Sequence, residues 1–462
     1  MQVKSRFVAI LTLIFALAAP AVAERPRPLG WAMDAMRAGN WQNAAAIAQR
    51  DGNVAADIIE WHRLRAGRGD YAEVAAFLSR RPDWPGEAYL RRKSEDAVIN
   101  AGRSAVLSFF AERTPQTARG VLAYAKAKTA QGEQGEADVS IVLAWRTMRM
   151  NDTSHAAFIA SHNDLLKPHH NARLSNMLWE GAATDARRML DLVPADQVAL
   201  ARARLALQHL NKDVNGLIDA VPAALRTDAG LQYDRFTWRA RKGRSADAKT
   251  LLRDQSTSAE ALGSPQAWSN RRRSLARDEM RDGDPKLAYQ LASRHFLTTG
   301  SAYADLEWLS GYIALRKLND PTTALGHFLR FDKAILSPIS KGRAGYWIGR
   351  AYDALNDPAQ ADQAYTNAAQ QQTSFYGLLA AERAGLAFDL GLVADDPMPD
   401  WRGSDMVKDP LFEAGLLLQA SGELDVAERF WTHYAERLDL HQAGQLGRAA
   451  IDVSQPHLAV MI

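Results

Sequence analysis

Apolar residues recur along most of this chain with the spacing of an α-helix. Clear stripes of such residues run over positions 306–313 and 344–355. Their members are Leu306, Leu309 and Ile313, then Ala344, Trp347, Ile348, Ala351 and Leu355. Spacings of three, four and seven place each set on one helix face. We find no run of alternating apolar and polar residues of the kind that predicts a strand, so the pattern predicts an all-α protein.

A turn followed by a helix recurs with an offset of 37 residues. Leu318-Asn319-Asp320-Pro321 precedes Ala324 and Phe328, and Leu355-Asn356-Asp357-Pro358 precedes Ala361 and Tyr365. Gly311-Tyr312 and Gly345-Tyr346 recur 34 residues apart, and looser copies of the turn begin at Gly69, Gly283 and Gly422. A period in the thirties with helix–turn–helix content is typical of an α-solenoid. We therefore predict a right-handed α-superhelix of stacked, TPR-like helix pairs, roughly twelve in number. The alternative is an ordinary all-α globule.

The N-terminus has the three parts of an export signal. Lys4 and Arg6 precede an apolar run over 7–19, and Ala21-Val22-Ala23 follows Pro20. About 13 apolar residues are too few to cross a bilayer, which needs about 20, and the small residues suit a cleavage site. We predict a signal peptide over 1–23, cleaved after Ala23, and a periplasmic protein with no integral membrane segment. An uncleaved anchor or a buried helix is the alternative.

The rest of the chain divides into three predicted parts. We assign residues 24–390 to the α-superhelical domain and 411–462 to a helical linker domain. Between them, 391–410 hold three prolines and two glycines and are predicted to be a linker. Near the end, Ser454 could cap a helix that starts at Pro456, and the apolar residues 458–462 follow. Such a stub makes a poor natural terminus, so we expect that the linker domain is truncated.

Composition narrows the possible functions. The 462 residues include no cysteine, which excludes disulfides, thiolate metal sites and a cysteine nucleophile. Lysine and arginine number 56 against 53 aspartate and glutamate, a net charge of +3. A strongly basic nucleic-acid binder is therefore not expected. Apolar residues make up 47%, as in a globular protein, so global disorder is excluded as well.

Two groups of side chains are tempting as chemistry. His155, His162, His169 and His170 form a histidine-rich stretch that could hold a metal if the rings converged, but there is no HExxH arrangement. Ordinary turn and helix-start positions are the favoured interpretation. Basic residues gather in two further stretches, for which we favour a solvated helix face over a surface for an anionic polymer such as peptidoglycan. These are Arg271, Arg272, Arg273 and Arg277, and Arg239, Arg241, Lys242 and Arg244.

No active site emerges from the residues themselves. A glycosidase-like carboxylate pair cannot be located by spacing, since its members come from different elements. The 12 tryptophans and 12 tyrosines could bind sugar rings, but at helical spacing they more often fill the space between helix layers. Motifs for a serine nucleophile, a phosphate loop and a dinucleotide are absent from the sequence. We predict no catalytic, cofactor-binding or metal-binding residue and no cofactor.

Several stretches nevertheless resemble the soluble lytic murein transglycosylases in their long superhelical region. The first lies at Arg81-Pro82-Asp83-Trp84-Pro85, and a middle group begins with His170-Asn171-Ala172-Arg173-Leu174. The strongest match spans 307–385. It contains Glu307-Trp308-Leu309-Ser310-Gly311, Tyr346-Trp347-Ile348-Gly349-Arg350-Ala351 and Phe375-Tyr376-Gly377-Leu378-Leu379. Residues 411–460 resemble the helical linker that follows in that family.

The resemblance implies a role in cell-wall turnover. In that family one glutamic acid cleaves the glycan between N-acetylmuramic acid and N-acetylglucosamine and forms a 1,6-anhydro end. That residue belongs to a lysozyme-like domain whose motifs do not occur in this chain, so no catalytic residue is carried over. The near matches at Gly415 and Ala364 fit better as packing positions. We expect the intact gene product to be an enzyme and these residues its non-catalytic part, with peptidoglycan glycan strands as a weakly bound partner. The alternative is a periplasmic helical-repeat scaffold that binds proteins, and no nucleic acid is expected.

Overall fold

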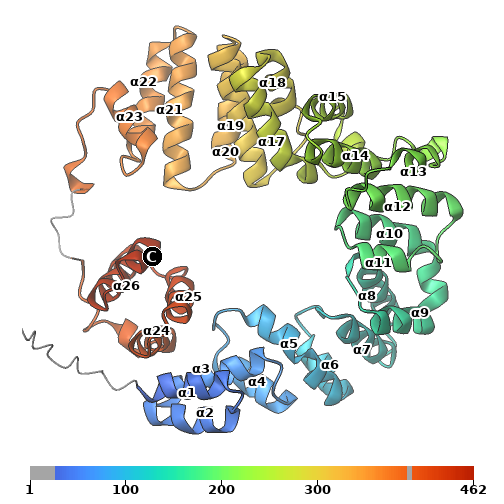
Figure 1. Ribbon diagram of the computed structural model, residues 1–462. Helices are drawn as coiled ribbons and strands as arrows, with labels where there is room; N and C mark the ends of the chain where they lie inside the picture. Colours follow the sequence, from blue (N-terminus) through green and yellow to red (C-terminus); the bar gives the residue numbers. More distant parts are fainter. Residues whose placement is uncertain (1–26, 393–397) are drawn as a thin grey trace, which may run out of the picture. The chain divides into compact units, whose positions relative to one another are not determined.

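The chain is built from helices throughout its described length. The computed structural model describes residues 27–392 and 398–462, and within them 27 α-helices and five short 3-10 turns form all the regular structure (Figure 1). No strand occurs in those ranges, so the all-α prediction is confirmed. The predicted signal peptide and residues 393–397 of the predicted linker lie outside the described residues.

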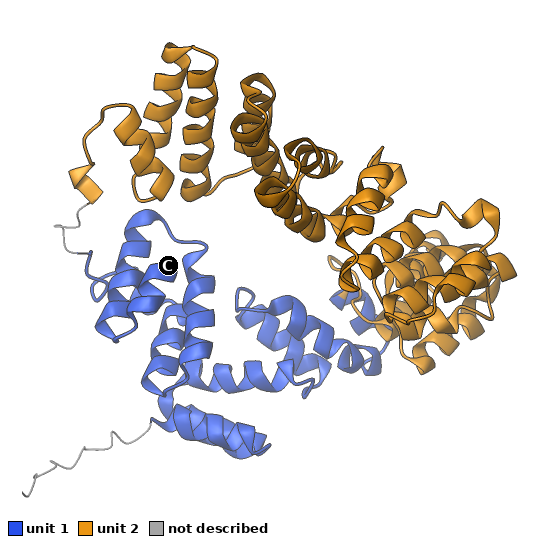
Figure 2. Ribbon diagram, turned by 45° about the horizontal axis from the view of Figure 1, so that its top comes forward, with its two compact units in different colours: residues 1–109, 397–462 blue, residues 110–396 orange. Residues whose placement is uncertain are grey.

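The helices form two compact units (Figure 2). Unit 1 combines the chain up to residue 109 with residues 397–462, and unit 2 comprises residues 110–396. The helices of unit 1 are α1 (Pro28–Arg37), α2 (Trp41–Ala48), η1 (Gln49–Asp51), α3 (Asn53–Arg65), α4 (Tyr71–Arg80), α5 (Glu87–Asn100), α6 (Arg103–Phe109), η5 (Asp405–Lys408), α24 (Pro410–Ala420), α25 (Leu424–Ala435), α26 (Leu440–Asp452) and α27 (Pro456–Met461).

Unit 2 is a continuous run of helices in which successive members pack as neighbours, as in an α-solenoid. Its helices are α7 (Ala118–Thr129), α8 (Gln134–Thr147), α9 (Asp152–Leu166), η2 (Lys167–His169), α10 (His170–Trp179), α11 (Ala183–Arg188), α12 (Ala195–Gln208), α13 (Asn215–Asp219), η3 (Ala223–Leu225), α14 (Ala229–Arg241), α15 (Ser245–Gln255), α16 (Ala259–Leu262), α17 (Pro265–Asp282), α18 (Pro285–Ser293), α19 (Gly300–Lys317), α20 (Pro321–Lys333), α21 (Pro338–Ala354), α22 (Pro358–Ala369), α23 (Phe375–Arg383) and η4 (Leu390–Leu392).

The repeated Leu-Asn-Asp-Pro sequence forms the same turn twice. Asn319 and Asn356 adopt φ values of +54° and +58°, the left-handed conformation that asparagine tolerates better than most residues. The aspartate that follows caps the next helix, because the Asp320 and Asp357 carboxylates accept hydrogen bonds from backbone N–H groups three residues later. Proline then occupies the first helical position, where its missing N–H costs nothing. Each residue type in the motif therefore has a local role.

Each copy of the repeat also fits a ring against a glycine. The Phe328 ring lies so close to Gly311 that a Cβ atom there would be 2.6 Å from it, and Tyr365 stands at 2.5 Å from the same position of Gly349. Gly349 is thus the structural counterpart of Gly311. Our pairing of Gly311 with Gly345 was wrong, because Gly345 approaches Ala368 on α22 instead of an aromatic ring.

The predicted apolar stripes face the core. Leu306, Leu309 and Ile313 are at most 1% exposed, and the stripe over 344–351 is buried as well. Leu355 is the exception at 36% exposed, because α21 ends at Ala354 and Leu355 belongs to the turn. The looser copy that begins at Gly69 also forms a turn before a helix, where Asp70 and Glu73 make a capping box at the start of α4.

Unit 1 brings together residues from both ends of the chain. The Phe430 ring of α25 meets the rings of Trp61 and Trp84 edge-on, with centroids 5.3 and 5.0 Å apart. The guanidinium of Arg437 pairs with the Asp83 carboxylate, and His433 Nε2 donates to the Asp83 carbonyl at 2.9 Å. All three aromatic side chains are at most 3% exposed. The turn over 81–85 is therefore a packing surface for the C-terminal helices.

The last helix differs in detail from its prediction. Helix α27 does begin at Pro456, but its N-cap is Gln455, and no side chain caps it. Ser454 adopts φ +61° and lies one residue before the N-cap position, so its predicted capping role was wrong.

The domain limits predicted at 390 and 411 stay a prediction. Every helix within 27–392 and 398–462 is either too short or too polar to span a bilayer.

Candidate functional site

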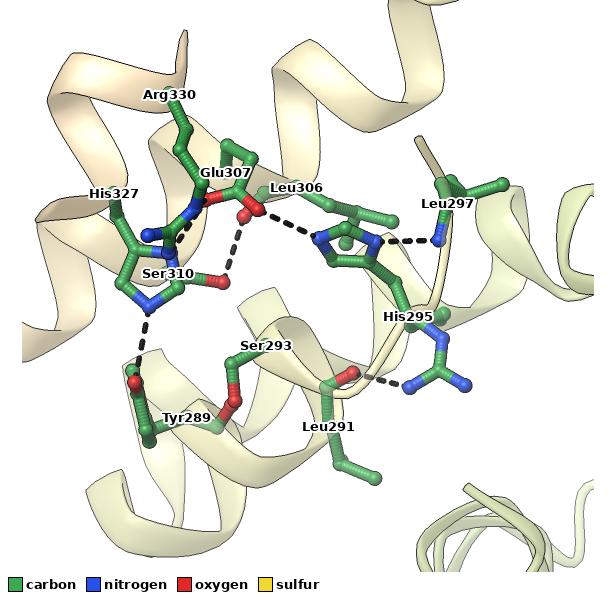
Figure 3. Close-up of polar contacts among 11 residues, drawn as sticks. Tyr289, Leu291, Ser293, His295, Leu297, Leu306, Glu307, Ser310, His327 and Arg330 are labelled. Atoms are coloured by element: carbon green, nitrogen blue, oxygen red, sulfur yellow. Dashed lines mark hydrogen bonds and ion pairs between the residues drawn. The ribbon is translucent and has the colours of Figure 1, made fainter. Parts of the chain in front are cut away.

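Glu307, in the middle of α19, anchors a buried polar network in unit 2 (Figure 3). It is 5% exposed. Its Oε1 accepts a hydrogen bond from His295 Nε2 at 3.2 Å, and its Oε2 accepts from His327 Nδ1 at 2.6 Å and Arg330 Nε at 2.9 Å. The donors come from the segment after α18 and from α20, so one carboxylate ties three successive elements together.

The proton of His295 can be assigned from its outer partner. The backbone N–H of Leu297 donates to His295 Nδ1 at 3.0 Å, so Nε2 carries the proton that His295 gives to Glu307. On the other side the Tyr289 hydroxyl lies 2.9 Å from His327 Nε2, and His327 Nδ1 lies 2.6 Å from Glu307 Oε2 and 2.7 Å from Arg330 Nη2. The Leu297 N–H and the Tyr289 hydroxyl thus hold the two histidine rings beside the carboxylate.

Glu307 is held as an anion. Burial raises its pKa, but the hydrogen bonds from His295 and His327, together with the charge of Arg330, outweigh that effect and bring the pKa to about 2. A general acid needs the opposite, a pKa raised toward neutrality so that a proton is available. Glu307 therefore acts as a structural anion, although it is the glutamate of the motif that resembles the transglycosylases.

The other residues of that motif also serve packing. Leu309 is 1% exposed, the Ser310 hydroxyl donates to the Leu306 carbonyl, and Gly311 receives the Phe328 ring. In the next motif, Trp347 packs against Tyr312, with ring centroids 5.1 Å apart. The motif residues that carry the resemblance are thus residues that pack the helices together, so they indicate a shared fold.

The histidine stretch does not converge on a metal site. His155 and His170 both lie beside the Trp145 ring, with centroids 5.0 and 5.6 Å away. Burial, with the nearby charge of Arg173, lowers the pKa of His155 to about 4. His169 closes the 3-10 turn η2 and His170 begins α10, as predicted. No group of three or more histidine, aspartate or glutamate residues in the described part of the chain could hold a metal ion.

The basic stretches are not uniformly solvated, which corrects the prediction for 271–277. Arg272 is 0% exposed and donates to the Leu291 carbonyl at 2.8 Å and the Ser256 hydroxyl at 2.7 Å. Arg273 pairs with Asp305 on α19. In the second stretch, Arg244 pairs with Asp247 on the surface. The first stretch therefore belongs mostly to the packing between α17, α18 and α19.

A pocket with a different character lies where the ends of α10 and α12 meet α14. It encloses about 360 Å³, and we name it the Trp179 pocket. Its main lining residues are Trp179, Gln208, Tyr233, Asp234, Thr237 and Arg241. The half-buried rings of Trp179 and Tyr233 stand 5.3 Å apart at an angle of 30°. Two aromatic rings and a buried carboxylate thus face one hollow.

Asp234 is the chemically unusual group of this pocket. It is 3% exposed, and its Oδ2 accepts hydrogen bonds from Arg204 Nε at 2.7 Å and Gln208 Nε2 at 3.1 Å. Burial raises the pKa of Asp234, while the charge of Arg204 acts against that rise. A carboxylate with a perturbed pKa in a cleft is a recognised mark of a functional site. No sequence signal predicted it, because its neighbours come from two other helices, α10 and α12.

A second hollow in unit 2 lies between α20 and α22, over one face of α21. It encloses about 410 Å³. Amide side chains of α22 line one wall, among them Gln360, Gln363 and Asn367. At its edge, the Lys341 ammonium donates to the Asp332 carboxylate at 2.9 Å. This hollow therefore offers neutral amide groups and one neutralised ion pair.

Comparisons with known proteins agree with the fold. The chain matches the 70 kDa soluble lytic transglycosylase of Escherichia coli with a TM-score of 0.57 and 17% identity over 94% of this chain and 69% of that one. An inactive mutant of the lytic transglycosylase Slt from Pseudomonas aeruginosa gives 0.62 and 18%, over 95% and 70%. The Escherichia coli protein in complex with bulgecin A gives 0.57 and 16%. No family model and no curated protein sequence matches the chain. The predicted resemblance is thus confirmed at the level of the fold.

Proposed function

We propose that this chain is the superhelical, non-catalytic part of a periplasmic peptidoglycan lytic transglycosylase. The observation that carries the proposal is the agreement in fold over 94–95% of the chain with solved lytic transglycosylases. In this proposal residues 1–23 direct export, 24–390 form the superhelical domain, 391–410 are a linker and 411–462 belong to a helical linker domain. The array binds glycan strands of the cell wall and orients them.

Cleavage itself belongs to a lysozyme-like domain in this proposal. There a glutamic acid protonates the glycosidic oxygen between N-acetylmuramic acid and N-acetylglucosamine, and the muramyl 6-hydroxyl closes the 1,6-anhydro ring. The state of Glu307 supports this division of labour, because a carboxyl group with a pKa of about 2 has no proton to give near neutral pH.

The test combines retention and product analysis. Purified protein is mixed with murein sacculi, the sacculi are sedimented, and the soluble fraction is analysed for anhydro-muropeptides by mass spectrometry. We expect weak, saturable co-sedimentation and no anhydro product. Release of anhydro-muropeptides would show that the chain itself cleaves the glycan, and failure to co-sediment would contradict its role in holding it.

A periplasmic scaffold for proteins is the second candidate. The amide wall of the hollow between α20 and α22 favours it, since side-chain amides can both donate to and accept from the backbone of an extended peptide. This candidate predicts that affinity capture retrieves specific proteins in stoichiometric amount while sacculi retain none of the chain. Gln363→Ala, on the amide wall, would then weaken the capture.

A further inference from the structure

The Trp179 pocket is built to receive an uncharged ligand with both polar and apolar surfaces. Its aromatic rings, Trp179 and Tyr233, offer apolar surface. The carboxamide of Gln208 and the hydroxyl of Thr237 stand in the same lining and offer hydrogen bonds. A volume of about 360 Å³ falls within the 300–1,000 Å³ typical of small-molecule sites.

The charge of the pocket argues against a cationic ligand. Two aromatic rings beside a carboxylate could form a cage for an ammonium group. Here the cation is already supplied by the protein, because Arg204 is 1% exposed, bonds to Asp234 at 2.7 Å and stands 5.2 Å from the centre of the Trp179 ring. The buried charges of Arg204 and Asp234 thus balance each other, and Glu180 and Arg241 add one charge of each sign to the lining. A neutral ligand would not have to displace the buried pair.

The pocket walls are held in place before any ligand arrives. The carboxamide of Gln208 is fixed by its nitrogen, because Nε2 donates to the Leu178 carbonyl at 2.8 Å and to Asp234 at 3.1 Å. Behind the indole, a Cβ atom on Gly263 would lie 3.0 Å from Trp179, so the glycine lets the backbone support the ring. A preformed site spends little of its binding free energy on ordering its own side chains.

We propose that the Trp179 pocket binds a pyranose unit of a glycan strand. A pyranose combines apolar C–H faces with a rim of hydroxyl groups, which matches aromatic walls beside amide, hydroxyl and carboxylate groups. The choice of an N-acetylated sugar rests on the proposed function, whereas the pocket's preference for a neutral polyol rests on its lining alone. Trp179 supplies the ring contact, Asp234 accepts from sugar hydroxyls, and Thr237 completes the polar side.

The test measures binding of chitotetraose to the purified protein by isothermal titration calorimetry. We compare the wild type with Trp179→Ala, Trp179→Phe and the control Trp31→Ala, which removes a 42% exposed tryptophan of α1 far from the pocket in sequence. We expect Trp179→Ala to weaken binding by about tenfold or more. Trp179→Phe should restore most of the affinity, and Trp31→Ala should match the wild type.

Further outcomes decide between the pocket and the wider proposal. No measurable chitotetraose binding by the wild type, or equal affinity in Trp179→Ala, would overturn the pocket inference. Thr237→Val gives an independent check, since it keeps the shape and removes a hydroxyl group, and unchanged affinity there together with unchanged affinity in Trp179→Ala would place the sugar elsewhere. Wild-type co-sedimentation with sacculi is measured separately. Its presence without pocket-dependent chitotetraose binding would leave the proposed function standing and refute only this site.

Discussion

Replacing Glu307 with glutamine should destabilise unit 2 by an amount that its pKa predicts. The carboxyl pKa falls from its ordinary 4.5 to about 2, and each unit corresponds to 1.36 kcal/mol, so the charged form is favoured by about 3 kcal/mol in the folded state. Glutamine keeps the shape but replaces one accepting oxygen with an NH2 group, which would face the donors of His327 and Arg330 or that of His295. Removing one partner of a buried ion pair typically costs about 3–5 kcal/mol, which agrees in size.

Thermal unfolding measured by circular dichroism gives the first readout. At pH 7 we expect a Tm lower by about 5 °C or more, on the scale of about 2 °C per kcal/mol for a large domain. Hydrogen exchange followed by mass spectrometry gives the second readout, with faster exchange in peptides of α19 and α20. The matched control is Glu382→Gln on α23, an exposed glutamate, which should leave both readouts unchanged.

The pH dependence of the stability difference between wild type and Glu307→Gln tests whether the charge of Glu307 causes it. Because the folded pKa of Glu307 is depressed, its contribution to the free energy of unfolding is complete above about pH 4.5 and is lost as the pH falls toward 2. The stability gap between wild type and Glu307→Gln should therefore stay constant from pH 7 to 5.5 and close near pH 2. An unchanged Tm at pH 7, or a gap that persists undiminished in acid, would refute the assignment of Glu307 as a buried structural anion.

Three other substitutions test the packing. Gly311→Ala should lower the free energy of unfolding by about 1–3 kcal/mol in chemical denaturation, because its methyl group meets the Phe328 ring, whereas Gly326→Ala on α20 should be neutral or raise it by up to about 1 kcal/mol. Asn356→Ala should cost about 1 kcal/mol and Asn356→Gly almost nothing by the same measurement, and equal losses would show that φ is not the cause. Phe430→Ala should cost about 3–5 kcal/mol and speed proteolysis within unit 1 while fragments of unit 2 keep their rate.

Features set by residues close in sequence could be predicted. The turn at 318–321 was recognisable because asparagine, aspartate and proline each satisfy a local backbone requirement within four residues. The burial of Leu306 and Leu309 followed from helical periodicity for the same reason. The predicted burial of Leu355 was wrong, because periodicity alone cannot distinguish the last residue of a helix from the first residue of the turn.

Features that need several elements to meet were missed. Arg272 was expected at the surface because arginine is rarely buried, and its partners, Ser256 and the Leu291 carbonyl, lie on other elements. The carboxylate of Asp234 gained its setting from α10 and α12, which no spacing within α14 reveals. The residue types of the candidate site could therefore be read from the sequence, but which of them lie next to each other is determined by the tertiary packing.

Unit 1 carries a consequence for how the protein is made. During synthesis, Trp61 and Trp84 leave the ribosome about 350 residues before their partner Phe430. Their rings therefore lack this packing partner while all of unit 2 is synthesised. Unit 2 is contiguous and can fold as it emerges, whereas unit 1 is completed only after release of α24 and α25. Chains interrupted before residue 410 would expose the apolar surface of α3 and of the turn after α4 that the C-terminal helices otherwise cover, and exposed apolar surface of this kind is what chaperones and proteases bind. Unit 1 can therefore become fully packed only in chains whose synthesis has continued past residue 410.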